Sequence, residues 1–408
     1  MNRKQLNLLI GLVLVVGGLG VIIYNRQTAS WNSNDSTIGG KLLPDLPLND
    51  VAEIAITQGT TNLHVVKKDD LWRVAERWDY PADFSKVSEL LRKLWELETV
   101  RKITVGPSQL GRLELLPPDK GTGSGTRLEL KDKDKKAIRS VMIGKKYMRE
   151  GDDSSPMGGG SIPVGRYVMV ESAGSESSPV WVLSDPLSQV ETKPDGWLDK
   201  TFFKVTKLRS AAITAANETN SWTIHRETET GDLMLADIQE AEHFDKSKAS
   251  GVGYLLSSPS FNDIVSPENS DTGFEAPRAA RIETFEGFTY TVKVGEKTGD
   301  ENFPIKVTVS ADLPAERTAG PDEKPEDKER LDKEFTDNHA KLVEKLDTEK
   351  ALEKWTYLVS KWTIDALLKE RNDFMAEENS EDATSAEPPS IPSFGPPDVG
   401  LPPPFPGQ

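Results

Sequence analysis

Histidine is the side chain best suited to proton transfer near neutral pH, and this chain has four of them: His64, His225, His243 and His339. None has a second histidine at the spacing that a metal ion needs, and no His-Glu-x-x-His sequence is present. His64 and His225 fall in strand-like stretches and His339 in a highly charged one, where solvated or hydrogen-bonded histidines are common. The histidines therefore predict no catalytic or metal site.

Two other stretches resemble binding sites in composition. Residues 121–125 (Gly-Thr-Gly-Ser-Gly) are rich in glycine, but no Gly-Lys-Ser/Thr ends the run and no helix pattern follows it, as a phosphate-binding loop would require. Asp132, Asp134, Asp152 and Asp153 suggest calcium, but the twelve-residue loop with a closing glutamate is missing. We interpret the glycines as a loop and the aspartates as turn residues.

Other catalytic patterns are equally weak. No Gly-x-Ser-x-Gly nucleophile elbow occurs, and 66 acidic residues are too many for a glycosidase-like pair to be selected. Tryptophans can line a sugar or peptide groove, but four of the nine fall on predicted strands or on the apolar face of a predicted helix, where core packing explains them: Trp72, Trp95, Trp181 and Trp222. We therefore expect no catalytic residue, no cofactor and no metal.

Composition narrows the classes of function. The absence of cysteine excludes disulfides, thiol nucleophiles, Cys-ligated zinc, iron–sulfur clusters and lipid attachment at a lipoprotein cysteine. A net charge of -16 would repel the phosphates of nucleic acid and the headgroups of anionic lipid, because binding to either needs clustered Lys and Arg. We therefore expect no nucleic acid among the partners.

The N-terminal region predicts a membrane anchor. Residues 6–24 (LNLLIGLVLVVGGLGVIIY) would form an apolar helix of about 28 Å, close to the thickness of the hydrocarbon core. No clear cleavage site follows, so we expect the helix to be retained. Arg3 and Lys4 precede it, which by the positive-inside rule keeps residues 1–5 in the cytoplasm and exports the rest. Residues 25–41 are predicted to be a flexible spacer.

The exported part begins with an α+β pattern. Three alternating runs around Ile54, Val65 and Trp72 predict an antiparallel meander. A helix should follow Pro81, capped by Asp83 or Ser85, because apolar residues then recur at three- and four-residue steps. Four more strands are predicted, at 127–130, 139–144, 166–171 and 180–184.

The pattern then recurs, which predicts a tandem repeat. Trp222-Thr-Ile224 resembles Trp72-Arg-Val74; the stretch 245–250 resembles 83–88; 292–297 resembles 141–146; and 357–360 resembles 181–184. Gly144 and Gly295, at matching places, suggest a bend or a turn with positive φ. We expect the units to span 42–204 and 205–375, each with a strand meander, a helix and further strands in mostly antiparallel sheets.

Two segments lie outside this pattern. Residues 311–354 are dense in charges of both signs, and from about Glu326 their spacing suits an exposed helix. A partner-binding arm is the alternative to this solvated helix. Residues 376–408 are acidic and then proline-rich, which predicts a disordered tail with polyproline II character. Composition favours a tail that only keeps the protein soluble, and a tail that binds an adaptor or spans the cell wall is the alternative.

Together these features resemble the DUF4340 family of bacterial envelope proteins. The resemblance is carried by the single anchor, the hairpin ending in Leu71-Trp72-Arg-Val74, the helix PADFSKVSELLRKLWELETVRKI, the strand VMIGKKY, the pair RYVMVE and VWVLS, and GWLDKTFF. It covers 42–310 and 355–375. It implies a domain of uncharacterised function, often encoded beside an ABC-type export system similar to gliding-motility transporters, and it transfers no catalytic residue.

The sequence thus predicts a non-enzymatic protein of the cytoplasmic (inner) membrane, anchored by residues 6–24, with most of the chain extracytoplasmic or periplasmic. We expect it to act as a scaffold or accessory subunit of an ABC-type transport system. A module that binds an envelope polymer or a small ligand between the two units is the alternative, and a hydrolase with unrecognised carboxylates is a third.

Overall fold

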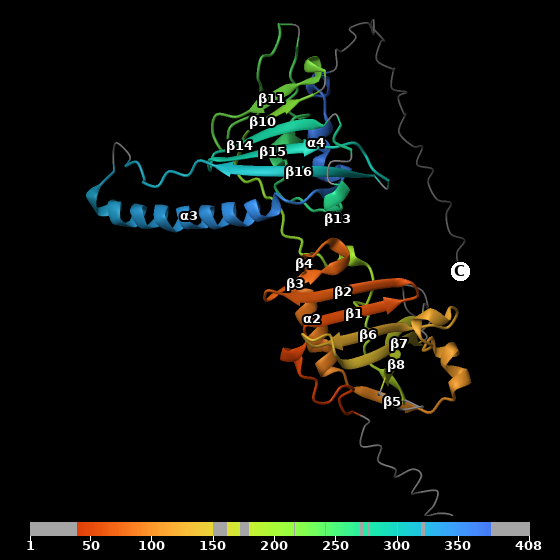
Figure 1. Ribbon diagram of the computed structural model, residues 1–408. Coiled ribbons are helices and arrows are strands. Elements are labelled where there is room, and N and C mark those ends of the chain that lie inside the picture. Colours follow the sequence, from red (N-terminus) through yellow and green to blue (C-terminus); the bar gives the residue numbers. More distant parts are fainter. Residues whose placement is uncertain are drawn as a thin grey trace, which may run out of the picture.

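The structure is a computed structural model that describes residues 39–149, 161–171, 179–215, 217–240, 242–269, 273–275, 277–299, 301–319 and 323–376. Within them the chain forms two antiparallel sheets, of nine and eight strands, accompanied by helices (Figure 1). The predicted α+β class is therefore confirmed. The predicted anchor at 6–24 and the tail after residue 376 lie outside the described residues. No helix in the described part is both long and apolar enough to cross a membrane.

The first sheet contains the predicted meander. Its strands follow the order β4-β3-β2-β1-β6-β7-β8-β9-β5. The β2–β3 connection is a two-residue turn in which Asp69 and Asp70 both have positive φ (50° and 61°), as the twist of a tight hairpin requires. The strands are β1 (Glu53–Gln58), β2 (Thr61–Lys68), β3 (Leu71–Val74), β4 (Tyr80–Pro81), β5 (Thr99–Ile103), β6 (Thr126–Lys131), β7 (Ala137–Arg149), β8 (Ile162–Glu171) and β9 (Val180–Leu183).

Helix α2 (Phe84–Glu96) packs on this sheet where the sequence predicted a helix. Asp83 is its N-cap, and one carboxylate oxygen accepts from the backbone N–H groups of Ser85 and Lys86 at 2.9 and 3.2 Å. The helix buries Val87, Leu90, Leu91 and Leu94 at three- and four-residue steps. A smaller apolar cluster consists of Leu115, Met142 and Val180.

The second sheet repeats the strand order of the first, apart from β4. Its order is β12-β11-β10-β14-β15-β16-β17-β13, so β10 corresponds to β1 and β13 to β5. Trp222 lies in β11, the counterpart of β2, whereas Trp72 lies in β3, so the predicted match between these two tryptophans is wrong. The strands are β10 (Leu208–Thr214), β11 (Trp222–His225), β12 (Met234–Leu235), β13 (Asp263–Ile264), β14 (Arg278–Thr284), β15 (Phe288–Val294), β16 (Asn302–Ala311) and β17 (Tyr357–Ser360).

The helices of the second unit differ from those of the first. The segment after Asp245 forms only a short 3-10 helix, η7 (Ser250–Tyr254), where Gly251 and Gly253 disfavour a longer helix. α4 (Lys361–Leu368) follows β17. The other 3-10 helices are η1 (Leu48–Asp50), η2 (Ala75–Arg77), η3 (Pro107–Leu113), η4 (Pro118–Lys120), η5 (Pro194–Trp197), η6 (Glu218–Asn220), η8 (Pro267–Asn269) and η9 (Arg371–Phe374).

The charged segment forms the predicted exposed helix, α3 (Pro325–Leu352), about 42 Å long. Pro325 at its first position and acidic residues in its first turn suit a helix N-terminus. Figure 1 shows its N-terminal part reaching beyond the second sheet. Its C-terminal part packs on the core through Leu342, Leu346 and Leu352, so this end of α3 is held against the second unit.

Gly144 and Gly295 allow close packing at the backbone. Neither has positive φ, so these positions use the missing side chain of glycine and not its backbone freedom. A Cβ on Gly144 would meet the backbone oxygen of Leu113 and, at 2.8 Å, Cδ2 of Leu115. A Cβ on Gly295 would lie 2.6 Å from the backbone oxygen of Gly273. The predicted positive φ is wrong. In the first unit the end of η3 instead packs directly on the backbone of β7, and in the second unit Gly273 packs on the residue that follows β15.

The two sheets share one continuous hydrophobic core. Between them lies an aromatic cluster with ring-centre distances of 4.7 to 6.4 Å. It comprises Tyr80, Phe202, Phe203, Phe261, Trp355 and Tyr357. Because Tyr80 comes from β4 and Tyr357 from β17, the cluster fixes the orientation of one sheet against the other.

Candidate functional site

The histidines do not gather into a site. Nδ1 of His64 lies 2.6 Å from a carboxylate oxygen of Glu76, whose other oxygen accepts from the His64 backbone N–H at 2.8 Å. His339 stacks on Phe335 on the exposed helix α3, with ring centres 6.0 Å apart. Nowhere in the described residues do three His, Cys, Asp or Glu side chains converge as a metal site would require.

The acidic and glycine-rich stretches have structural roles. One carboxylate oxygen of Asp132 accepts from the backbone N–H groups of Asp134 and Lys136, both at 2.9 Å, which closes the turn before β7. Gly121 and Gly123 have positive φ in a turn that leads into β6. The prediction of turns is confirmed here. Residues 152 and 153 lie outside the described residues.

Three of the four selected tryptophans are buried as expected: Trp72, Trp181 and Trp222. Trp222 also donates from Nε1 to the backbone oxygen of Lys369 at 3.0 Å. The prediction for Trp95 is wrong, because 40% of it is exposed. It sits at the flank of the apolar stripe of α2, with the ammonium of Lys41 3.1 Å from its ring centre.

A groove of about 510 Å³ lies on the second unit, where η7 and the following loop lie beside α4. We call it the Trp362 groove. Trp362 and Tyr254 line it, and each is 76% exposed. Single exposed apolar residues are ordinary, but two large aromatics lining one groove are characteristic of a binding surface. The remaining lining residues are Gly251, Leu255, Leu256, Ser257, Ser258, Pro259, Lys361, Thr363, Asp365, Ala366 and Lys369.

Packing beneath the groove holds its aromatic side chains at the surface. Leu255 and Leu256 turn into the core, where they are 4% and 3% exposed. On α4, Ile364 and Leu367 are fully buried, which leaves Trp362 on the outer side of this helix. Thr363 donates from its hydroxyl to the backbone oxygen of Ser260 at 3.3 Å and so ties α4 to the opposite wall. The groove is therefore positioned by regular elements.

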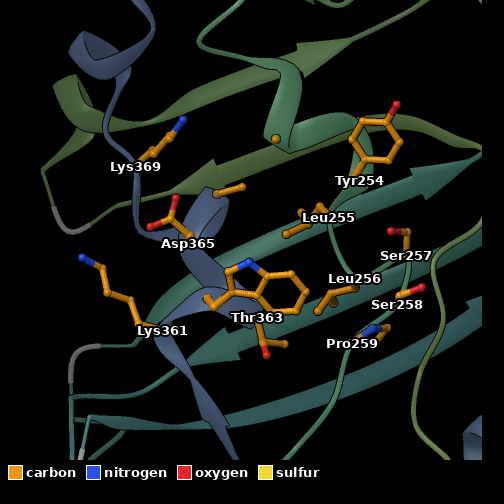
Figure 2. A pocket seen from close by; sticks show the side chains of 13 residues that line it. Tyr254, Leu255, Leu256, Ser257, Ser258, Pro259, Lys361, Thr363, Asp365 and Lys369 are labelled. Carbon is orange, nitrogen blue, oxygen red and sulfur yellow. The ribbon is translucent and has the colours of Figure 1, made fainter. Parts of the chain in front are cut away.

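The charged side chains that line the groove lie on one side of it. Figure 2 shows Lys361, Asp365 and Lys369 on the α4 side, and Tyr254 with Ser257, Ser258 and Pro259 on the other. The Lys369 ammonium donates to the backbone oxygen of Lys248 at 2.9 Å. An apolar floor with a polar rim suits an extended peptide better than a small buried substrate.

A second hollow, of about 500 Å³, lies between the two units; we call it the inter-unit cleft. Trp78 and Trp355 line it together with Lys68, Asp69, Arg73, Asp79, Pro267 and Lys354. Trp78 is partly exposed and has φ of 53°, a conformation that costs free energy for a bulky side chain. Lys68 is bonded to Asp79 at 2.7 Å, so part of the positive charge in this cleft is neutralised.

The sequence patterns did not single out Trp362 or Tyr254. The signal for Trp362 was its place in KWTIDALL, where the apolar residues at 364 and 367 define the inner side of a helix and put 362 outside it. No comparable signal exists for Tyr254, because its exposure follows from the short 3-10 helix that ends there.

The chain matches a family described as a domain of unknown function (DUF4340) over residues 72–277. The match runs from β3 to the residue before β14, and so covers most of the first unit and the opening part of the second. No curated protein and no solved structure matches the chain. Because the match spans half of the sequence, this protein belongs to the DUF4340 family.

Proposed function

We propose that this protein is a non-enzymatic accessory or scaffold subunit of an ABC-type transport system, anchored in the cytoplasmic membrane by residues 6–24 with its folded part extracytoplasmic. The apolar run at 6–24 with Arg3 and Lys4 before it supports the anchor and its orientation. The setting of the family, beside export systems similar to gliding-motility transporters, supports the choice of partner.

The observation that carries the binding role is the Trp362 groove, with Trp362 and Tyr254 exposed over an apolar floor. Tryptophan and tyrosine are enriched among the few residues that supply most of the free energy of protein association. Burying these two rings under a partner would recover hydrophobic free energy that the described fold leaves unused. We therefore place the partner contact at this groove.

The fixed orientation of the two units supports a scaffold role. The aromatic cluster around Tyr80 and Tyr357 packs the two sheets together, so a partner bound to one unit is held at a set position relative to the other. We infer from the shared strand order that the units arose by duplication. α3 and the Trp362 groove both belong to the second unit, which supports a division of roles between the units.

Purification from native membranes tests this proposal. The full chain, tagged at its N-terminus, is captured in mild detergent, and co-purifying proteins are identified by mass spectrometry. We expect ABC-type membrane subunits in fixed ratio, reduced at least tenfold by Trp362→Ala. Phe84→Ala is the matched control, because Phe84 is 67% exposed on α2, outside the groove. Recovery of the protein without transporter subunits would refute the transporter assignment, and equal recovery with Trp362→Ala would refute the groove.

The inter-unit cleft supports a second candidate function, binding of an envelope polymer or a small ligand. Trp78 has positive φ here, and such conformations persist where the surrounding structure holds them, often at binding sites. Arg73 and Lys354 favour an anionic ligand, and the tryptophans offer flat surfaces for a sugar ring. An acidic oligosaccharide should raise the melting temperature of the wild type and not of Trp78→Ala; no rise in the wild type would count against this function.

A further inference from the structure

The Trp362 groove has the chemistry of a site for a polyproline II helix. Proline-rich segments bind in shallow grooves lined by aromatic side chains, because their preformed backbone loses little entropy on binding and their rings pack on flat aromatic faces. Here Tyr254 and Trp362 supply the aromatic surfaces. This inference rests on the proposed function, because it concerns what occupies the same groove.

The chain carries such a segment itself. Residues 388–406 read PPSIPSFGPPDVGLPPPFP, with two Pro-x-x-Pro sequences, Pro389-Ser-Ile-Pro392 and Pro403-Pro-Phe-Pro406. Phe394, Leu401 and Phe405 are interspersed among the prolines and add apolar surface. This composition matches the ligand class that the groove favours.

The described chain ends beside the groove. The backbone N–H of Ala376 donates to the backbone oxygen of His243 at 2.7 Å, and the Lys248 ammonium donates to the backbone oxygen of Met375 at 2.9 Å. The backbone oxygen of Lys248 in turn accepts from the ammonium of Lys369, a lining residue of the groove. One lysine therefore links the point where the tail leaves the fold to the wall of the groove.

Length and charge are compatible with docking of the tail. Residues 377–387 connect the last described residue to the first proline, and an extended chain covers at most about 3.5 Å per residue, so they could span on the order of 35 Å. This connector is acidic, with Glu377, Glu378 and Glu381 among its residues. Lys361 and Lys369 line the α4 side of the groove, together with one acidic residue, Asp365.

We propose that residues 388–406 dock in cis into the Trp362 groove as a polyproline II segment and cover it until a partner displaces them. Tethering gives such a tail an effective concentration in the millimolar range. A weak intramolecular contact is therefore sufficient to keep the groove mostly occupied. Removing the tail should then raise the affinity of a partner for the groove, on the order of tenfold if the covered form predominates by that factor.

The absence of cysteine allows a direct test by cross-linking of the full chain in detergent. Ser258→Cys places a thiol on the exposed rim of the groove, and Ser393→Cys places one between the two Pro-x-x-Pro sequences. The matched control pairs Ser393→Cys with Ser85→Cys, an exposed position on α2 of the first unit. A short bis-maleimide joins only thiols that come close together.

We expect the groove pair to cross-link within one chain at least fivefold more than the control pair, and the excess to disappear when Trp362→Ala is added. Equal cross-linking of both pairs, or no effect of Trp362→Ala, would overturn the proposal. Cross-links only between two chains would assign the groove to the tail of a second copy and would also overturn docking in cis. Loss of transporter subunits with Trp362→Ala is measured separately, so the proposed function can stand where this inference fails.

Discussion

Arg77 and Asp263, 186 positions apart in the sequence, form a paired ion bridge between the two units. Nε and Nη2 of the guanidinium donate to the two carboxylate oxygens at 2.6 and 2.7 Å. The hydrogen bond to Asp263 is the main reason that the pKa of Arg77 is raised above its ordinary value. Arg77 ends η2 and Asp263 begins β13, so the bridge fixes the edge of one sheet against the edge of the other.

Breaking this bridge should weaken the junction between the units. Because both side chains are about three-quarters buried, Arg77→Met and Asp263→Asn should each lower the free energy of unfolding by about 1–3 kcal/mol. Denaturant unfolding of both single variants and the double variant gives the coupling energy, which we expect to exceed about 1 kcal/mol. The exposed pair Arg92 and Glu96 on α2 is the control, and its coupling energy should be about 0.5 kcal/mol. Additive single effects at Arg77 and Asp263 would contradict a direct coupling.

The aromatic cluster should contribute more than the ion bridge. Tyr80 is 1% exposed, with its ring 5.1 Å from that of Trp355. Tyr80→Ala should cost about 3–5 kcal/mol, because it leaves a cavity between the units. Tyr80→Phe should cost about 1 kcal/mol or less, because it keeps the ring in the cluster and removes only the hydroxyl. Calorimetry should show one transition for the wild type, and independent melting of the units would contradict the shared core.

The close packing at Gly144 predicts a large effect of a single methyl group. Gly144→Ala would place a Cβ against the backbone oxygen of Leu113, and overpacking of this kind costs about 1–3 kcal/mol or more. Gly106→Ala is the control, because nothing lies within 4 Å of its added Cβ and its φ is -75°. We expect Gly106→Ala to be neutral or slightly stabilising. Equal unfolding midpoints of the two variants in urea would contradict this role of Gly144.

The buried carboxyl group of Glu349 should make the stability of the fold depend on pH. Burial raises its pKa above the ordinary 4.5, although the Lys204 backbone N–H bonds one carboxylate oxygen at 2.9 Å and the Lys345 ammonium opposes the rise. The folded state therefore holds this proton more tightly than the unfolded state. The contribution of protonated Glu349 to the free energy of unfolding is fully present below about pH 4.5. It is lost as the pH rises through the raised pKa of the folded state. Each tenfold difference in proton affinity between the folded and unfolded states corresponds to about 1.4 kcal/mol.

Glu349→Gln should remove this decline, because an amide does not titrate. Between pH 5 and 8, the unfolding free energy of the wild type should fall relative to that of Glu349→Gln by the amount that Glu349 contributes. Glu344→Gln is the control on the exposed side of the same helix and should keep the slope of the wild type. Parallel curves for the wild type and Glu349→Gln would show that Glu349 is not the titrating group.

The sequence by itself determined the features that depend on local order along the chain. The alternation around Ile54 and Val65, the capping carboxylate of Asp83 and the charge spacing after Glu326 are short-range patterns, and each predicted its strand, cap or helix.

Only the tertiary structure decided which distant residues meet. It paired Arg77 with Asp263, showed that Gly144 faces a backbone oxygen at the end of η3, and placed Trp222 in a strand that does not correspond to that of Trp72. It also put Trp362 beside Tyr254 in one groove, more than a hundred positions apart. Periodicity shows which side of an element is apolar, but the contacts between elements depend on how the whole chain packs, and a site assembled from such contacts leaves little trace in the local sequence.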